Sequence, residues 1–184
     1  MRVRRAKLDD AGFIAETYAP FVIETSVSFE TVPPDAAEIA RRMEAAGEAY
    51  PWLIAEADGE RAGYAYASQH RTRAAYQTSV DTAIYLAGEA RGQGIAMPLY
   101  EALFDVLIAQ NFVMAFAGVT IPNHASEAFH RKAGFKQIAR YPNVGFKNGA
   151  WRDVIWFAKE LAQPVTPPTP LKPVSELDLD ALLA

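Results

Sequence analysis

The chain has 184 residues, of which 51% are hydrophobic, and a net charge of −4 at pH 7. This length fits one domain, with or without an extension, that can bury a substantial core. The negative charge and the lack of a Lys/Arg-rich block argue against a nucleic-acid partner and favour a small molecule or a protein. The sequence has no cysteine, which excludes disulfides, thiol nucleophiles and thiolate metal sites and fits a reducing compartment.

The amino-terminal residues do not look like a targeting segment. The basic residues Arg2, Arg4 and Arg5 are followed by the charged stretch 7–10 and not by an apolar region, so no secretory signal is predicted. The apolar runs elsewhere are too short to span a bilayer. We therefore expect a soluble, cytoplasmic protein with no membrane partner.

Hydrophobic spacing and turn residues predict alternating strands and helices over most of the chain. The residues 112–119 are apolar throughout, which is typical of a strand buried on both faces. The expected elements, in order, are a strand at 2–6, a helix from Asp9-Asp10, a loop at 25–34, a helix from Pro34 or Asp35 to about Ala46, a hairpin of 52–57 and 61–67, a strand ending at Leu86, a helix through Leu99 to Leu107, the strand 112–119, a helix from Asn123 to Ala133, and strands at 135–147 and 154–157.

This order, β-α-α-β-β-β-α-β-α-β-β, predicts an α/β (α+β) fold in which helices flank a mixed central β-sheet in a single domain of residues 1–161. The composition changes after Leu161, where five prolines occur within residues 163–174. Such a segment is extended and polyproline-like. We treat residues 162–184 as a Pro-rich extension that ends in a short helix and lies against its own domain or a neighbouring subunit.

The stretch Arg91-Gly92-Gln93-Gly94-Ile95-Ala96 lies between a predicted strand and a predicted helix. Consecutive backbone N–H groups at a helix start form a suitable site for a phosphate. The stretch lacks the Lys-Ser/Thr ending of a P-loop, and its place in the chain does not fit a dinucleotide fold. Taken alone it is equally well explained as an ordinary strand-to-helix turn. A second element, Asn123-x-x-Ser126-x-x-x-His130-x-x-x-Gly134-Phe135, follows one helix and one strand later.

Together these two elements resemble the GNAT superfamily of acyl-CoA-dependent N-acetyltransferases. Over about residues 2–160 the chain is similar to the phosphinothricin/methionine sulfone N-acetyltransferase family, and the Pro-rich end is like that of some members. The segments that carry the resemblance are 50–55, 73–76, 79–85, 91–96, 121–123, His130 and 145–154.

The resemblance implies a GNAT fold, acetyl-CoA as co-substrate and no metal. The turn formed by Arg91, Gly92, Gln93, Gly94, Ile95 and Ala96 would hold the pyrophosphate of the coenzyme. Ile84, Tyr85 and Leu86 would pair through their backbone with the pantetheine arm, and Asn123 and Ser126 would also contact the coenzyme.

Two residues are candidates for acid–base chemistry. The resemblance places Asp81 where the family has a glutamate, so its carboxylate is about one methylene shorter and would act as general base through a water. The alternative is a strand-end carboxylate that binds nearby backbone. His130 occupies a position that is often tyrosine in the superfamily, and its imidazole would protonate the thiolate or relay the proton of the amine. His70 and His124 have no comparable motif, and the three histidines show no metal-ligand spacing.

The acceptor site is expected to include residues of the connector 70–77 and of the first loop. An arginine fork suits a carboxylate or phosphinate, which favours Arg71 and Arg73, together with Tyr76. Phe29 matches an aromatic position in the family's substrate pocket, and the resemblance implies a homodimer whose partner closes the pocket near Lys147 and Val154. The alternative is that these are solvated loop charges and one buried ring.

The expected activity is transfer of an acetyl group from acetyl-CoA to the α-amino group of a small amino-acid analogue, such as phosphinothricin, methionine sulfone or methionine sulfoximine. Such a reaction is a detoxification. Two alternatives stay open. One is an acetyltransferase of protein N-termini or polyamines, and the other is a non-catalytic acyl-CoA-binding module, which the aspartate at position 81 would favour.

Overall fold

A computed structural model describes residues 1–183, and the order of its elements is the one predicted from the sequence. The strands are β1 (Arg2–Arg5), β2 (Trp52–Ala57), β3 (Glu60–Gln69), β4 (Ser79–Leu86), β5 (Met114–Ile121), β6 (Lys136–Lys147) and β7 (Ala150–Glu160). The helices are α1 (Ala11–Ile23), α2 (Ala36–Ala46), α3 (Ala96–Ala109), α4 (His124–Lys132) and α5 (Leu179–Leu182), with short 3₁₀ turns at Leu8–Asp10, Ala74–Tyr76, Gly88–Ala90 and Val174–Glu176. Within residues 1–183 no helix has the length and apolar character needed to cross a membrane.

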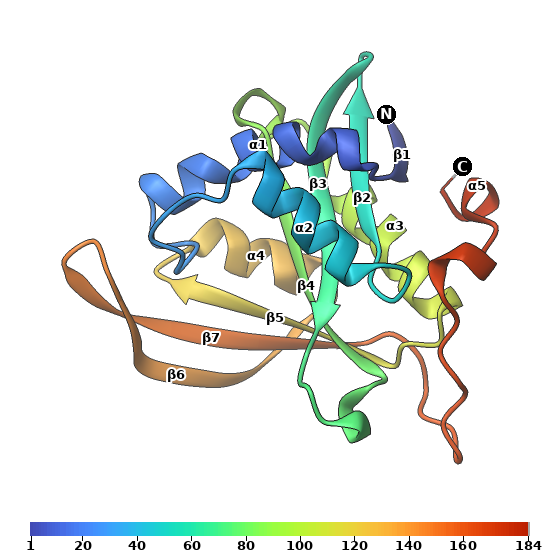
Figure 1. Cartoon of the computed structure of the whole chain (residues 1–184). Helices are drawn as coiled ribbons and strands as arrows, with labels where there is room; N and C mark the ends of the chain where they lie inside the picture. Colours follow the sequence, from blue (N-terminus) through green and yellow to red (C-terminus); the bar gives the residue numbers. More distant parts are fainter. Residues whose placement is uncertain (184) are drawn as a thin grey trace.

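The seven strands form one mixed sheet in the order β1-β2-β3-β4-β5-β7-β6. Strands β4 and β5 run parallel, and the other neighbouring strands are antiparallel. Helices α1 and α2 cover one face of the first strands, whereas α3 and α4 lie behind the sheet on the other face (Figure 1). The β6–β7 hairpin extends away from this layered body. The mixed sheet flanked by helices confirms the predicted fold class.

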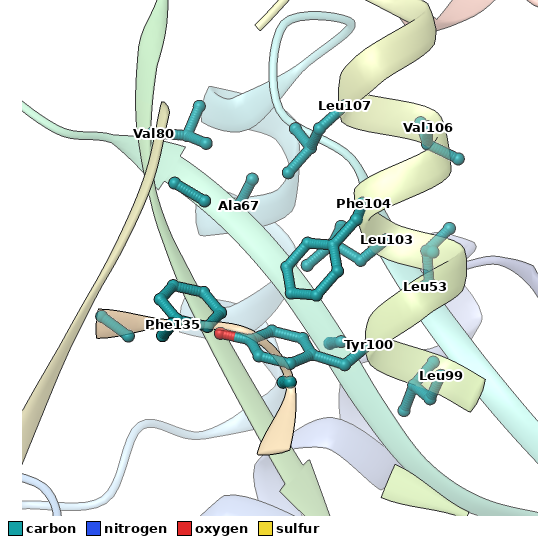
Figure 2. Packing of buried hydrophobic residues seen from close by; sticks show 14 of the residues in the cluster. Leu53, Ala67, Val80, Leu99, Tyr100, Leu103, Phe104, Val106, Leu107 and Phe135 are labelled. Carbon is teal, nitrogen blue, oxygen red and sulfur yellow. The ribbon is translucent and has the colours of Figure 1, made fainter. Parts of the chain in front are cut away.

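The larger core lies between α3 and the sheet. The apolar stripe of α3 is buried because residues three and four apart share one helix face, and Leu99, Leu103 and Leu107 on that stripe have no exposed surface. The aromatic rings of Tyr100 and Phe135 stack 5.9 Å apart on the same side. Figure 2 shows these α3 side chains packed toward Leu53, Ala67 and Val80 of the sheet.

The prediction that residues 112–119 are buried on both faces is wrong. Ala115, Ala117 and Val119 are buried, but Phe116 is half-buried and Gly118 is exposed. The alternation arises because α3 and α4 cover one face of β5, whereas α1 and α2 pack on the opposite face only over β2, β3 and part of β4. An apolar strand with one open face therefore borders a space that another molecule can enter.

The carboxy-terminal extension packs on the domain. Val174 is 1% exposed and its N–H donates to the carbonyl of Glu48 at 2.8 Å. Gln110 binds the extension through both backbone and side chain, since its carbonyl accepts from the Lys172 N–H and its Nε2 donates to the Lys172 carbonyl, each at 3.0 Å. The extension therefore lies against its own domain, as expected, while the division at residue 161 stays a prediction.

Candidate active site

A cavity opens where the parallel strands β4 and β5 separate. Their pairing ends at Asp81, which is opposite Phe116, and the next five residues of β4 have no partner in β5. At this point Thr82 Oγ1 donates to the Phe116 carbonyl at 3.2 Å and accepts from the Tyr100 hydroxyl at 2.6 Å. The cavity has a volume of about 290 Å³ and is lined by 82–86 of β4, 117–120 of β5, Ala96, Asn123, Ala125, Ser126, Phe129 and His130 near the helices, and Val27 of the first loop.

The glycine turn lies at the α3 end of this region. Gly92 and Gly94 have φ angles of +77° and +80°, which side chains with a Cβ adopt only with strain, so the sequence needs glycine at both positions. The first N–H groups of α3, which begins at Ala96, have no partners within the helix and are free to bind an anion. The arrangement fits a pyrophosphate.

The side chains of the turn do not reach toward this anion site. The Arg91 guanidinium lies over the Phe21 ring, 4.7 Å from its centre, and Gln93 Nε2 donates to the Glu89 carbonyl at 2.7 Å. A pyrophosphate would thus be held by backbone donors. The β4 segment with Ile84, Tyr85 and Leu86, which is half-buried and has no partner in β5, leads along the cavity to this turn.

Asn123 and His130 are placed by the first turns of α4. Asn123 caps this helix, because its Oδ1 accepts from the Ser126 N–H at 3.2 Å, which leaves its Nδ2 as a possible donor to a ligand. One turn later, His130 Nδ1 lies 2.8 Å from the Ser126 carbonyl. Since a carbonyl can only accept, Nδ1 carries the hydrogen and Nε2 of the neutral ring is unprotonated.

His130 is held in an aromatic cage below the cavity. Its ring stacks on Phe157 with centres 5.6 Å apart and meets the edges of Tyr100 and Phe135. Burial lowers the pKa of His130, against the hydrogen bond to Ser126, which raises it. The ring therefore stays neutral near pH 7 and presents an acceptor nitrogen.

The two predicted acid–base residues lie on opposite faces of the sheet. Thr82 points toward α3, where it meets Tyr100, so the preceding Asp81 points to the other face. On β7 the same alternation separates Phe157, which stacks on His130, from Trp156, which contacts His70 beside Asp81. The gap between β4 and β5 joins the two faces.

Asp81 binds a histidine that no sequence motif marks. His70 Nδ1 lies 2.6 Å from Asp81 Oδ1, and its ring stacks on Phe116 with centres 4.3 Å apart and an angle of 15° between planes. Burial raises the pKa of the Asp81 carboxyl, while the hydrogen bond and charge of His70 and the charge of Arg71 lower it. Register explains the contact: Ser68 of β3 is opposite Asp81, and His70 is its diagonal neighbour two residues on.

The connector brings two of the three predicted acceptor residues to His70. The Arg71 guanidinium lies 5.9 Å from the Trp156 ring and donates to the His70 carbonyl at 2.7 Å. Tyr76 meets the His70 ring edge-on, with centres 6.1 Å apart. Arg73 is exposed and precedes the 3₁₀ turn Ala74–Tyr76.

Phe29 lies in the first loop, against the β6–β7 hairpin. A Cβ at Gly145 would overlap its ring, so glycine there permits close approach of the loop. Lys147 of the hairpin is buried, and its Nζ donates to the carbonyls of Val22, Ser28 and Glu30 at 2.6–2.7 Å. Val154 lies on β7, opposite Thr120 of the cavity wall. Among residues 1–183, no group of three or more His, Asp or Glu side chains is placed to hold a metal ion.

A comparison with known protein families identifies the class of this protein. The model of the acetyltransferase (GNAT) domain family matches residues 3–156, and the chain therefore belongs to this family of acetyltransferases. A crystal structure of a phosphinothricin acetyltransferase from Sinorhizobium meliloti in complex with AcCoA has a TM-score of 0.85 and 33% identity, covering 94% of this chain and 97% of that one. The family and the fold that the resemblance implied are confirmed.

Curated relatives include proteins named for small acceptors. A phosphinothricin N-acetyltransferase of Streptomyces coelicolor is 35% identical over 175 residues, which are 88% of this chain and 96% of that protein. An L-methionine sulfoximine/L-methionine sulfone acetyltransferase of Pseudomonas paraeruginosa is 30% identical over 161 residues, which are 86% of this chain and 94% of that protein.

Proposed function

We propose that this protein transfers the acetyl group of acetyl-CoA to the α-amino group of a small amino-acid analogue, of the phosphinothricin, methionine sulfone or methionine sulfoximine type. The observation that carries the proposal is the cavity between β4 and β5, whose lining includes Ala96 at the start of α3 and Thr82, the residue after Asp81. The names of the relatives support this acceptor class. Acetylation removes the positive charge of the amine, which fits a detoxifying role in the cytoplasm.

The coenzyme side of the cavity would be built largely from backbone. The N–H groups of residues 92–96 would bind the pyrophosphate at the start of α3. The free edge of Ile84, Tyr85 and Leu86 would align the pantetheine arm, with Asn123 Nδ2 as a further donor. Bound acetyl-CoA supplies the thioester carbonyl that the amine attacks.

The two proton transfers would take place on opposite faces of the sheet. Asp81 lies on the face opposite to His130 and would act, through a water, as general base for the incoming ammonium group. His130 lies on the coenzyme face, and as a neutral ring its Nε2 would take up a proton and pass it to the departing thiolate. We therefore assign His130 the relay role.

The acceptor's negatively charged groups would meet the arginines of the connector. Arg71 lies beside Trp156 on the face that holds Asp81, and Arg73 and Tyr76 follow it along the chain. The Phe29 ring would supply an apolar wall from the first loop.

We also infer a homodimer, because the β6–β7 hairpin exposes a large apolar surface. Phe146 and Trp151 are 61% and 62% exposed, and their rings contact each other with centres 5.4 Å apart. Ile138, Tyr141 and Val144 extend this surface. Sedimentation of the native chain should give a dimer, and Trp151→Glu should give a monomer, while Val165→Glu in the extension should leave the mass unchanged. A native monomer at all concentrations would rule out the dimer.

Thiol release from acetyl-CoA tests the proposed function. The amine panel consists of phosphinothricin, methionine sulfone, methionine sulfoximine, methionine, a peptide with a free N-terminus and a polyamine. We expect kcat/KM for at least one of the amino-acid analogues to exceed that for the peptide and the polyamine by at least about tenfold. Preference for the peptide or polyamine would contradict the acceptor class, and tight coenzyme binding without any turnover would indicate a binding module.

A further inference from the structure

His70 and Asp81 form a pair whose geometry is fixed from several sides. The ring of His70 lies flat on Phe116 of β5, and its Nδ1 is 2.6 Å from Asp81 Oδ1. The rings of Tyr76 and Trp156 meet its edges, with centres 6.1 and 6.3 Å away. The side chain of His70 is only 11% exposed. These contacts leave the imidazole little freedom to turn, and they direct Nδ1 to the carboxylate.

A histidine bound to a carboxylate through Nδ1 has its second nitrogen free for proton transfer. The carboxylate accepts only, so Nδ1 keeps its hydrogen and the neutral ring has an unprotonated Nε2. The carboxylate also stabilises the imidazolium that forms when Nε2 takes a proton. The imidazole places this nitrogen well beyond the carboxylate oxygen, which compensates for the short side chain of aspartate at position 81.

We propose that His70 and Asp81 act together as the general base: His70 Nε2 removes the proton from the acceptor amine, and Asp81 orients the ring and stabilises its cation. This inference rests on the proposed acetyltransferase function and names a residue for its proton-removal step. It replaces the water between Asp81 and the amine that the sequence suggested.

The protons and bonds of the reaction balance. The ammonium group loses one proton to His70 Nε2, and the resulting amine forms a C–N bond with the acetyl carbon as the C–S bond breaks. The nitrogen then loses a second proton, which passes by way of His130 to the sulfur. The products are the amide and the free thiol, and the His70 imidazolium releases its proton to water.

The two charged groups near His70, one negative and one positive, act on its ring in opposite senses. Asp81 of β4 favours the imidazolium, whereas the Arg71 guanidinium, which donates to the His70 carbonyl at 2.7 Å, disfavours it. The phenol ring of Tyr76 faces His70 from the connector, and Phe116 and Trp156 of the sheet carry no charge. The charged groups that act on the His70 ring are therefore Asp81 and Arg71.

Four proteins test the pair in steady-state turnover: the native chain, His70→Phe, Asp81→Glu and the double variant. His70→Phe keeps the stack on Phe116 but cannot accept a proton, and we expect it to lower kcat/KM for the amine about a hundredfold, with the Kd of acetyl-CoA unchanged. In the Asp81→Glu background the longer carboxylate reaches the amine itself. In that background His70→Phe should therefore lower kcat/KM for the amine by less than about threefold. An equal loss in both backgrounds, or no loss in either, would overturn the proposal.

A further variant separates proton transfer from positioning. His70→Asn retains an N–H that can donate to Asp81 but has no nitrogen that accepts a proton. We expect it to be as impaired as His70→Phe, and the acid limb of kcat/KM for the amine should change in both. Native activity in His70→Asn would show that His70 only orients Asp81 and would reject the proposal.

Proton NMR of the protein alone distinguishes failure of this inference from failure of the proposed function. The His70 Nδ1–H should give a strongly deshielded resonance that Asp81→Asn removes and that His124→Gln leaves in place. If the native chain acetylates no amine, the proposed function and the general-base role both fail, although the resonance would still establish the pair. If the native chain is active but no such resonance depends on Asp81, the pair is refuted and the function stands.

Discussion

The ammonium group of Lys147 lies 2.6 Å from the carbonyl oxygen of Ser28, a residue 119 positions earlier in the chain. Two further carbonyls, those of Val22 and Glu30, accept from the same nitrogen at 2.7 Å. Lys147 thus joins the end of α1, the loop that carries Phe29 and the β6–β7 hairpin. Burial lowers the pKa of Lys147, against the charge of Glu30, which raises it.

Replacing Lys147 by methionine should loosen the Phe29 loop. The variant leaves three carbonyls without their donor, so the free energy of unfolding should fall by about 2–4 kcal/mol. The KM of the acceptor should rise more than that of acetyl-CoA, because Phe29 of this loop is a proposed wall of the acceptor site. Urea unfolding and steady-state kinetics measure both effects. Lys136→Met, at an exposed position of β6, is the control, and an unchanged acceptor KM in Lys147→Met would argue against a role for this loop.

The glycine turn gives a second prediction. Gly94→Ala forces a residue with a Cβ into a φ of +80°, which costs about 1–2 kcal/mol and displaces the N–H groups before α3. We expect weaker acetyl-CoA binding, measured by calorimetry, and little change in acceptor KM once the coenzyme saturates. Gly88→Ala is the matched control, because a Cβ meets nothing within 4 Å at either glycine but only Gly94 has a positive φ. Equal Kd values of acetyl-CoA for the two variants would show that the turn does not bind the coenzyme.

The hydroxyl chain from Tyr100 through Thr82 to the Phe116 carbonyl holds the point where β4 leaves β5. Thr82→Val leaves a buried hydroxyl without an acceptor and a carbonyl without this donor, which should destabilise the fold by about 1–3 kcal/mol. Tyr100→Phe keeps the hydrogen bond from the Thr82 hydroxyl to the Phe116 carbonyl. It should therefore lower the free energy of unfolding less than Thr82→Val does. The KM of acetyl-CoA should increase in Thr82→Val and stay near the native value in Tyr100→Phe. If the KM of acetyl-CoA rose in Tyr100→Phe and stayed near the native value in Thr82→Val, these hydrogen bonds would not determine the shape of the cavity.

His130 predicts a pH dependence of stability. Its pKa in the folded protein lies below the unfolded value of about 6.5. Below pH 6.5 the unfolded ring binds a proton that the folded ring does not, so the free energy of unfolding falls as pH drops through this window. Urea unfolding at pH 7.5 and 5 should show a smaller decrease for His130→Phe than for the native chain. His124→Gln, whose native side chain is 93% exposed, should keep the native decrease.

The extension is expected to contribute to stability. Val174→Ala removes two methyl groups from a buried position, and we expect a loss of about 2 kcal/mol by urea unfolding. Val165→Ala in the exposed part of the same segment should have almost no effect. If both variants behave alike, the extension does not form part of the folded core.

The order of the elements could be predicted because each pattern is local. The β2–β3 hairpin follows from its turn residues, the helix α3 from its apolar stripe, and the glycine turn from its place between a strand and that helix. The open face of β5 could not be predicted, since its apolar sequence does not say which helices cover it. That face depends on tertiary packing.

Side-chain contacts between different strands of the sheet are the part of the candidate site that is harder to predict from the sequence. Asp81 and His130 were proposed from motifs, but His70 has no motif and meets Asp81 only through the register of β3 and β4. A sequence signal existed in principle, because a histidine just past a strand is close to the facing strand once the register is known. Lys147 is a similar case, since its three acceptors lie more than a hundred residues away.

The separation of β4 and β5 after Asp81 leaves a cavity that is lined by residues of both strands, of α4 and of the first loop. In the proposed function the coenzyme would bind on the α3 and α4 side, and the amine would arrive on the side of Asp81 and His70. Neither substrate then has to pass through the route of the other, and both can be bound at once. Initial-rate kinetics should therefore indicate a ternary complex with no compulsory order of addition, and either product can depart while the other is still bound.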